Sequence, residues 1–277
     1  MRGVCHGPAM QHIDPKRRGY LVCGEPRSGS SFLVRALMST GTLGYPFEYF
    51  GREGCVREIV ADPARGLANL LEHGATPNGV YGAKLFSDQL DMIAPANWIA
   101  QLPGLHFVHL ERADLLGQAI SLLRATQSRQ FISLEPARAA PRYDGAAIDG
   151  LIRKLAAGQA RWRSYFARNG IVPLHLLYED VAADPQAAAG ALGRLLGLDE
   201  EPLVNLARVS PKVQRDAVSQ EWRARFLAEA GDLARLDALP ARDLGRPFRS
   251  LRQRLGRSLR RAPPNWRSGE PERRGSD

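Results

Sequence analysis

Tyr20-Leu-Val-Cys-Gly-Glu-Pro-Arg-Ser-Gly-Ser-Ser31 is the stretch that decides the fold. A short apolar run leads into a loop with glycines at 24 and 29, and residues 32–38 follow with the apolar spacing of a helix. The two glycines match the phosphate-binding loop G-x-x-x-x-G-K-[ST], but Ser30 stands where that loop has its lysine. With the cation moved to Arg27, the loop suits a phosphate–sulfate anhydride better than a Mg²⁺-bound triphosphate. N–H groups at the helix start would face this anion.

The composition predicts one large domain with appendages. The chain has 277 residues, 44% of them hydrophobic, which is enough for one sizeable core. Its 38 Lys and Arg against 29 Asp and Glu give a net charge of +9, and residues 246–277 hold ten Arg against three acidic residues. We predict an N-terminal extension over 1–19, the domain over 20–243 and a basic tail over 244–277.

Two interpretations of the basic tail stay open. It is either a solvated, disordered chain or a basic amphipathic helix that touches anionic surfaces. Gly256 and the Pro263-Pro264 pair weaken the helix. No nucleic-acid partner is expected, because the tail lacks aromatic residues interleaved with its arginines.

Several classes of protein find no support in the sequence. No apolar run is long enough to span a bilayer, and the N-terminus lacks the regions of a signal peptide, so a cytoplasmic protein is predicted. The three cysteines form no C-x-x-C pair and the six histidines show no H-E-x-x-H spacing. We therefore expect neither a disulfide framework nor a metal site. His109 is interpreted as a hydrogen-bonded core histidine rather than a catalyst.

Strands and helices alternate along the chain. Besides the first strand, buried strands are predicted at 79–86, 106–110 and 171–178. Helices are predicted at 63–72, 115–129, 147–168, 185–196 and 219–229. This order predicts an α/β fold with a mostly parallel sheet flanked by helices, and ligands beyond the carboxyl ends of its strands. Residues 130–149 are predicted to form a long loop, either a lid or an acceptor-binding flap.

Five segments in this order and spacing resemble one family, the bacterial carbohydrate sulfotransferases that act on trehalose, lipopolysaccharide or nodulation factors. The resemblance covers about residues 20–230. The segments are Pro26-Arg-Ser-Gly-Ser-Ser31, Thr40-Gly-x-x-Gly-x-Pro-x-Glu-Tyr-Phe50, Pro77-Asn-Gly-Val-x-Gly-x-Lys84, Arg112-x-Asp114 with Gln118 to Ser121, and Ser219-x-Glu-Trp222. The resemblance implies a P-loop-like sulfotransferase fold, a carbohydrate or glycolipid acceptor and a possible homodimer. It also implies 3′-phosphoadenosine 5′-phosphosulfate (PAPS) as co-substrate, with no metal needed for the transfer.

The resemblance assigns the residues that bind the co-substrate. Arg27 and the loop after it would hold the 5′-phosphate, through the N–H groups and hydroxyls of Ser28, Gly29, Ser30 and Ser31. Arg112 and Ser121 match the pair that binds the 3′-phosphate, for which the planar fork of an arginine is suited. The alternatives are a surface Arg27 in a generic strand-to-helix turn, a salt bridge from Arg112 to Asp114, and a Ser121 without a role. Gln214, Asp216 and Trp222 match a segment that either closes over the co-substrate or, for Trp222, packs.

The resemblance also assigns the acceptor side. Glu48 matches the general base that would take the proton of the sugar hydroxyl. Phe47, Tyr49 and Phe50 would desolvate Glu48 or stack on a sugar ring, and Lys84 would contact the sulfuryl group or the acceptor. Tyr45 and Pro46 would complete the substrate-binding residues. The alternatives are a Glu48 that caps or pairs, aromatic residues that fill the core, and a merely solvated Lys84.

Two departures from the family pattern bear on the acceptor. Pro26 replaces a polar residue near the sugar and Tyr45 replaces an acidic one, so an acceptor other than trehalose is at least equally expected. Two competing functions remain. One is a P-loop kinase or nucleotide-binding protein, which the missing lysine disfavours. The other is a non-catalytic polyanion-binding protein, suggested by the basic tail.

Overall fold

The computed structural model describes residues 17–50, 62–93, 98–130, 139–209 and 216–230. The chain divides into two compact units, Met1–Glu229 and Ala230–Asp277, and the fold described below is that of the first. The predicted basic tail over 244–277 lies outside the described residues, as does most of the predicted N-terminal extension. Among the described residues, no helix combines the length and the apolar character that crossing a membrane requires.

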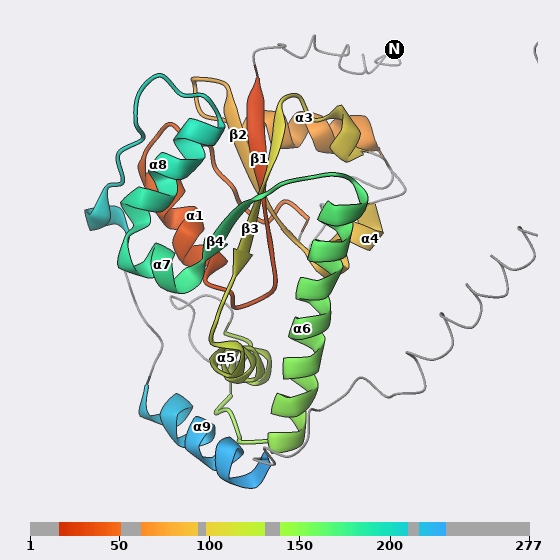
Figure 1. Ribbon diagram of the computed structural model, residues 1–277, viewed down its shortest axis with the longest axis vertical. Coiled ribbons are helices and arrows are strands. Elements are labelled where there is room, and N and C mark those ends of the chain that lie inside the picture. The colour runs from red at the N-terminus through yellow and green to blue at the C-terminus, as the bar shows by residue number, and fades with distance from the viewer. Residues whose placement is uncertain (1–16, 51–61, 94–97, 131–138, 210–215, 231–277) are drawn as a thin grey trace, which may run out of the picture. The chain divides into compact units, whose positions relative to one another are not determined.

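A parallel sheet of four strands forms the centre of the first unit, in the order β2-β1-β3-β4 (Figure 1). The strands are β1 (Arg18–Gly24), β2 (Val80–Phe86), β3 (Leu105–Glu111) and β4 (Leu174–Leu177). The chain passes from β1 to β2 on one side and then to β3 on the other side of β1. This reversal of strand order places a ligand crevice at the carboxyl end of β1, where the loop of residues 24–29 begins.

Helices cover both faces of the sheet. They are α1 (Ser30–Ser39), α3 (Pro63–His73), α4 (Ser87–Ile93), α5 (Leu115–Ser128), α6 (Gly145–Arg168), α7 (Tyr178–Ala183), α8 (Pro185–Leu195) and α9 (Ala217–Ala230), with short 3₁₀ helices at Trp98–Gln101 and Leu206–Arg208. The predicted α/β class and its parallel sheet are confirmed.

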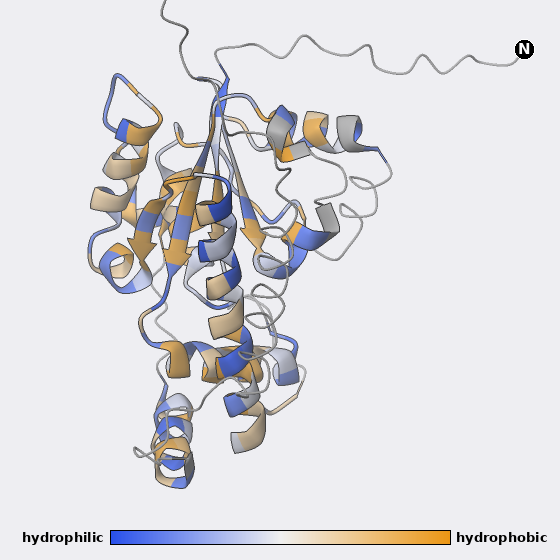
Figure 2. Ribbon diagram, turned by 45° about the vertical axis from the view of Figure 1, so that its right-hand side comes forward, coloured by the Kyte–Doolittle hydropathy of each residue, from blue (hydrophilic) through white to orange (hydrophobic). Residues whose placement is uncertain are grey.

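Alternation along β1 explains the two layers of the core. Leu21 and Cys23 face α3 and α6, whereas Tyr20 and Val22 face α1, α7 and α8. Successive side chains of a strand point to opposite faces, so one apolar run serves both layers. Figure 2 shows the result, with hydrophobic strands between helices that turn hydrophilic residues outward.

Three predictions about the elements need correction. The strand predicted at 171–178 is shorter, because Tyr178 already begins α7. The short helix α4 was not predicted. The predicted loop over 130–149 is too long, because α6 begins at Gly145, where the Asp144 carboxylate accepts a hydrogen bond from the Ala147 N–H. Residues 131–138 of that loop lie outside the described residues.

A third apolar cluster joins α5, α6 and α9. Trp222 of α9 is buried there, as the packing interpretation predicted, and meets the Tyr143 ring edge-on with 5.8 Å between centroids. Helix α9 is therefore packed against α5 and α6 by apolar contacts.

Trp162 of α6 connects the core to the loop after β1. Its side chain is fully buried, stacks on Phe166 with 5.7 Å between ring centroids, and donates a hydrogen bond from Nε1 to the Gly24 carbonyl at 3.1 Å. The indole N–H of Trp162 thus fixes Gly24, the first residue of the loop, to the core.

We expect Trp162→Phe to destabilise the protein. The unpaired Gly24 carbonyl would cost roughly 1–3 kcal/mol, and the smaller ring would leave additional empty volume. Urea unfolding measures the loss, with Trp222→Phe as a matched change of a buried tryptophan on α9. An unfolding free energy within about 0.5 kcal/mol of wild type would show that the Trp162 hydrogen bond does not matter.

Candidate functional site

The loop between β1 and α1 has a strained backbone. Arg27 has φ 64° and Gly29 has φ 89°, both in the left-handed region. A Cβ at Gly29 would lie 2.0 Å from the Tyr178 ring, so only glycine fits there. Gly29 is the N-cap of α1, and the first turn of this helix holds no acidic residue. The N–H groups that open α1 thus face a position suited to an anion.

The serines of the loop differ in their roles. Ser28 and Ser30 are buried and Ser31 is exposed. The Ser28 N–H donates to the Glu25 carbonyl at 3.2 Å, which corrects the expectation that this N–H would hold the 5′-phosphate. The Ser28 hydroxyl oxygen, in contrast, is buried without a hydrogen-bond partner among the described residues. This hydroxyl and the N–H groups of Ser30 and Ser31 remain as anion donors.

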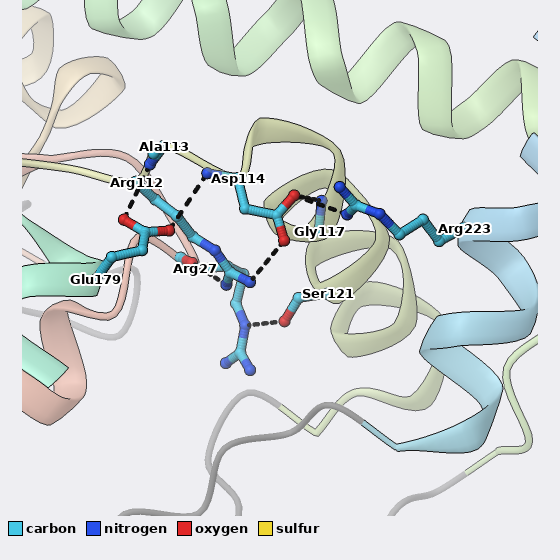
Figure 3. Close-up of polar contacts among 8 residues, drawn as sticks. All are labelled: Arg27, Arg112, Ala113, Asp114, Gly117, Ser121, Glu179 and Arg223. Atoms are coloured by element: carbon cyan, nitrogen blue, oxygen red, sulfur yellow. Dashed lines mark hydrogen bonds and ion pairs between the residues drawn. The ribbon is translucent and has the colours of Figure 1, made fainter. Parts of the chain in front are cut away.

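Arg27, Arg112 and Ser121, which the resemblance assigns to the co-substrate, come together (Figure 3). Arg27 Nε donates to Ser121 Oγ at 2.9 Å, and Arg112 Nη1 donates to the Arg27 carbonyl at 3.3 Å. The Arg112 guanidinium also lies 5.3 Å from the centre of the Tyr178 ring. Three segments that are distant in the sequence therefore meet at the carboxyl ends of β1 and β3.

The alternative salt bridge of Arg112 is also present, but it is loose. Arg112 Nη2 lies 3.7 Å from Asp114 Oδ2. Asp114 accepts closer hydrogen bonds from the Gly117 N–H at 3.0 Å and from Arg223 Nη1 at 2.7 Å. Arg112 Nε is buried without a hydrogen-bond partner in the described part of the chain. A buried N–H of this kind favours an additional acceptor such as a phosphate oxygen.

Positive charge is concentrated around Arg27. Burial lowers the pKa of Arg27, and the charges of Arg112 and Arg124 lower it further. Arginine nevertheless keeps its proton in proteins, so the guanidinium groups repel one another. An anion with two phosphate groups would relieve this repulsion, and the residues present thus fit a 3′,5′-bisphosphate nucleotide.

Two residues that the sequence analysis did not assign hold the loop and the turn after β3 in place. Glu179 of α7 accepts hydrogen bonds from the N–H groups of Ala113 and Asp114 at 3.1 and 3.3 Å. Gln118 of α5 donates from Nε2 to the Pro26 carbonyl at 2.8 Å. Gln118 belongs to one of the five segments that resemble the family, but the resemblance gave it no role. Glu179 is 65 residues from Asp114 along the chain, so no local sequence pattern indicates their contact.

Glu48 lies beside β2 and has two polar partners. Lys84 Nζ is 3.1 Å from Glu48 Oε2, and Gln89 Nε2 donates to Glu48 Oε1 at 3.0 Å. The Lys84 N–H donates to the Phe47 carbonyl at 2.9 Å, so the loop that carries Glu48 runs along the edge of β2. Gln89 in turn accepts from the Phe86 N–H at 2.9 Å. The carboxylate is held in one position while its residue stays exposed.

The residues around Glu48 divide into two groups. Phe47 is half exposed and meets the partly buried Tyr49 edge-on at 6.4 Å between ring centroids. Pro46 is buried against Gly82, and Phe50 is buried in the core cluster of β1 and β2. Tyr45 is partly buried and its carbonyl accepts from the Tyr49 hydroxyl at 2.9 Å. The rings therefore leave Glu48 solvated, contrary to the expected desolvation, and Phe50 fills the core.

A family model described as Stf0 sulphotransferase matches residues 19–229, a range that includes every candidate site residue. The chain belongs to the Stf0 sulphotransferase family. The resemblance to bacterial carbohydrate sulfotransferases is thus confirmed, together with the transferase class that it implied.

Two relatives and one solved structure illustrate the likeness. The trehalose 2-sulfotransferase of Mycobacterium tuberculosis (strain ATCC 35801 / TMC 107 / Erdman) is 30% identical over 262 residues, 77% of this chain and 96% of the relative. The trehalose 2-sulfotransferase of Mycolicibacterium smegmatis is 29% identical over 76% of this chain and 95% of its own length. The sulfotransferase domain of the Synechococcus PCC 7002 olefin synthase aligns with 77% of this chain and 90% of that domain, at 16% identity and a TM-score of 0.36.

The loop of residues 24–29 in this Stf0-family chain also contains a buried carboxyl group, that of Glu25. Burial raises the pKa of Glu25 to about 7, although hydrogen bonds with Ser87 oppose the shift. Gly158 of α6 is needed beside it, because a Cβ there would lie 2.2 Å from the Glu25 carboxyl carbon. Glu25 Oε1 has no hydrogen-bond partner in the described ranges.

We expect Glu25 to make stability depend on pH. Between the ordinary value of 4.5 and the folded value of about 7, the folded protein binds more protons than the unfolded chain. The stabilisation by protonated Glu25 is therefore complete below pH 4.5 and is lost as the pH rises through 7, by up to roughly 3 kcal/mol.

Glu25→Gln should remove this dependence. In urea unfolding measured from pH 4 to pH 8.5, the variant should gain on wild type with rising pH, whereas the exposed control Glu200→Gln should show a constant difference. Parallel curves for Glu25→Gln and wild type would rule out a buried, protonated Glu25.

Proposed function

We propose that this protein transfers a sulfuryl group from PAPS to a carbohydrate hydroxyl. The observation that carries the proposal is the meeting of Arg27, Arg112 and Ser121 next to the opening of α1. Family membership supports the transfer of a sulfuryl group. Two relatives that bear the name trehalose 2-sulfotransferase support a sugar as the acceptor.

The donor would be held by charges and N–H groups at the carboxyl ends of β1 and β3. Arg27, the Ser28 hydroxyl and the N–H groups of Ser30 and Ser31 would bind the 5′-phosphate. Arg112 and Ser121 would bind the 3′-phosphate, for which the free Nε position of Arg112 is available. When bound, PAPS supplies an activated sulfuryl group on a phosphate that can leave. Positive charge fixed at this phosphate stabilises the negative charge that develops there.

Glu48 would act on the acceptor. Its exposed carboxylate accepts the proton of the attacking hydroxyl, while Gln89 and Lys84 fix its orientation. Lys84 is nearly buried, with 11% of its side chain exposed, and thus adds a positioned positive charge rather than a freely solvated one. Because little covalent chemistry remains for the protein, alignment and charge would provide most of the rate enhancement.

The acceptor would bind at the aromatic side chains beside Glu48, of which Phe47 is half exposed and Tyr49 and Tyr45 are partly buried. Phe47 and Tyr49 offer ring faces or edges for a pyranose, with Tyr45 next to them. Pro46 and Phe50 support this surface from beneath. Because of the replacements at Pro26 and Tyr45, a glycan other than trehalose is at least equally expected as the acceptor. Three further properties stay predictions: the glycan that serves as acceptor, the formation of a homodimer and the cytoplasmic location.

The donor site is tested by calorimetric titration with 3′-phosphoadenosine 5′-phosphate, with Mg-ATP as the competing ligand. We expect metal-independent binding of the bisphosphate that weakens roughly 10- to 100-fold in Arg27→Ala and in Arg112→Ala, because each loses charge-assisted hydrogen bonds. Arg153→Ala removes an exposed arginine of α6 and should bind like wild type. A preference for Mg-ATP would favour the kinase alternative, and equal losses in all three variants would indicate unspecific polyanion binding.

The role of Glu48 is tested by Glu48→Gln, which keeps the shape but cannot accept the proton. With a panel of trehalose, glucose and lipopolysaccharide glycans and labelled PAPS, kcat should fall about 10²- to 10⁴-fold. Affinity for the bisphosphate should stay unchanged. Glu72→Gln on α3 serves as the matched exposed control. Transfer by Glu48→Gln at a rate close to wild type would assign the base to another residue.

A further inference from the structure

A group of three metal-ligating side chains lies on one face of β3 and β4, and is called here the His-Glu-His cluster: His109, Glu111 and His175. His109 and Glu111 are two residues apart on β3 and thus point to the same face of the sheet. The parallel register places His109 directly opposite His175 of β4. The fold therefore brings together residues that are 66 positions apart in the sequence.

The ligand atoms of the cluster are close enough for one ion. Glu111 Oε2 lies 2.5 Å from His175 Nε2, and Glu111 Oε1 lies 4.0 Å from His109 Nε2. All three ligand atoms are within 4.8 Å of one another. Ligands bound to one tetrahedral Zn²⁺ at its usual bond lengths lie roughly 3.4 Å apart. The observed separations bracket this value, so small side-chain rotations suffice to form the site.

His109 supplies a second, independent observation. Its residue is only 2% exposed, and its Nε2 is buried without a hydrogen-bond partner among the described residues. The ring packs edge-on against Phe166, 5.3 Å between centroids, so its orientation is fixed. This corrects the expectation of a hydrogen-bonded core histidine. The histidine is in the core, but its free nitrogen faces a carboxylate across a gap too wide for a hydrogen bond.

We propose that His109, Glu111 and His175 bind a divalent transition-metal ion of the Zn²⁺ class. Two imidazole nitrogens and one carboxylate favour Zn²⁺ over Mg²⁺ or Ca²⁺, which prefer oxygen ligands alone. His175 is half exposed and gives the ion access from solvent, while His109 closes the site from within. An open fourth position is left for water.

Arg163 of α6 competes with the ion for the same carboxylate. Its Nη2 lies 3.0 and 3.3 Å from the two Glu111 oxygens, and 69% of its side chain is exposed. Only Arg163 is exposed in this pair, whereas 7% of the Glu111 side chain is exposed. The metal ion therefore balances the charge of the buried carboxylate as it displaces the guanidinium into solvent. The bound ion joins the ends of β3 and β4 directly before Arg112, and it takes no part in the sulfuryl transfer.

The test is a titration of the full-length, tag-free, chelator-treated chain with Co²⁺, followed by visible absorption, and then displacement by Zn²⁺. We expect the absorption bands of a tetrahedral Co²⁺ site in wild type and binding at least about 10-fold weaker in His175→Ala. His106→Ala is the matched control, because His106 lies on β3 but points to the opposite face. It should bind Co²⁺ like wild type.

Arg163→Ala separates this site from unspecific binding by surface histidines. Removal of the competing cation should tighten Co²⁺ binding roughly two- to fivefold, an effect that no distant site would show. Circular dichroism of the metal-free variants verifies that they are folded. Absence of a tetrahedral spectrum, or equal Co²⁺ affinity of wild type and His175→Ala, would overturn the proposal and leave the cluster as a polar network between β3, β4 and α6.

Discussion

Repulsion between partly buried arginines is the constraint on which the rest of the site depends. Arg27 has a left-handed backbone and a partly buried side chain, and the charges of Arg112 and Arg124 repel its own. Such an arrangement is unfavourable without an anion, so the surrounding fold has to maintain it. Ser121 and Gln118 of α5 hold the side chain of Arg27 and the carbonyl of Pro26. The proposed donor site is therefore formed before a ligand binds, which would reduce the free energy needed to assemble it.

Acidic side chains behind the site balance these arginines without occupying it. Arg124 makes a two-pronged contact with Asp216 at 2.6 and 2.7 Å, and this contact lowers the pKa of Asp216 to about 2. Arg223 of α9 binds Asp114, which caps α5 and keeps Arg112 only loosely paired. Through Arg223, helix α9 thus contributes to the balance of charge around the proposed donor site.

Local sequence patterns predicted the elements well, and long-range contacts explain what they missed. Buried apolar runs and capping residues marked β1 to β4 and the longer helices, and the resemblance assigned Arg27, Arg112 and Ser121 to one co-substrate. Glu179 was not predicted, because its partner Asp114 comes from another strand end. The pairing of His109 with His175 likewise follows from strand register, which no local spacing encodes. Gln214 of the matched C-terminal segment lies outside the described residues.

Two glutamates near the site show how environment separates roles that residue type leaves open. Glu25 follows β1 directly but is buried against Gly158, and burial raises its pKa to about 7, so a large part of it carries its proton at neutral pH. A carboxyl group enclosed in this way cannot reach a sugar hydroxyl. Glu48 is exposed and is oriented by Lys84 and Gln89, so it can meet an acceptor that arrives from solvent. Access therefore favours Glu48 as the proposed base, while the Glu25 carboxyl group stays enclosed beside Gly158.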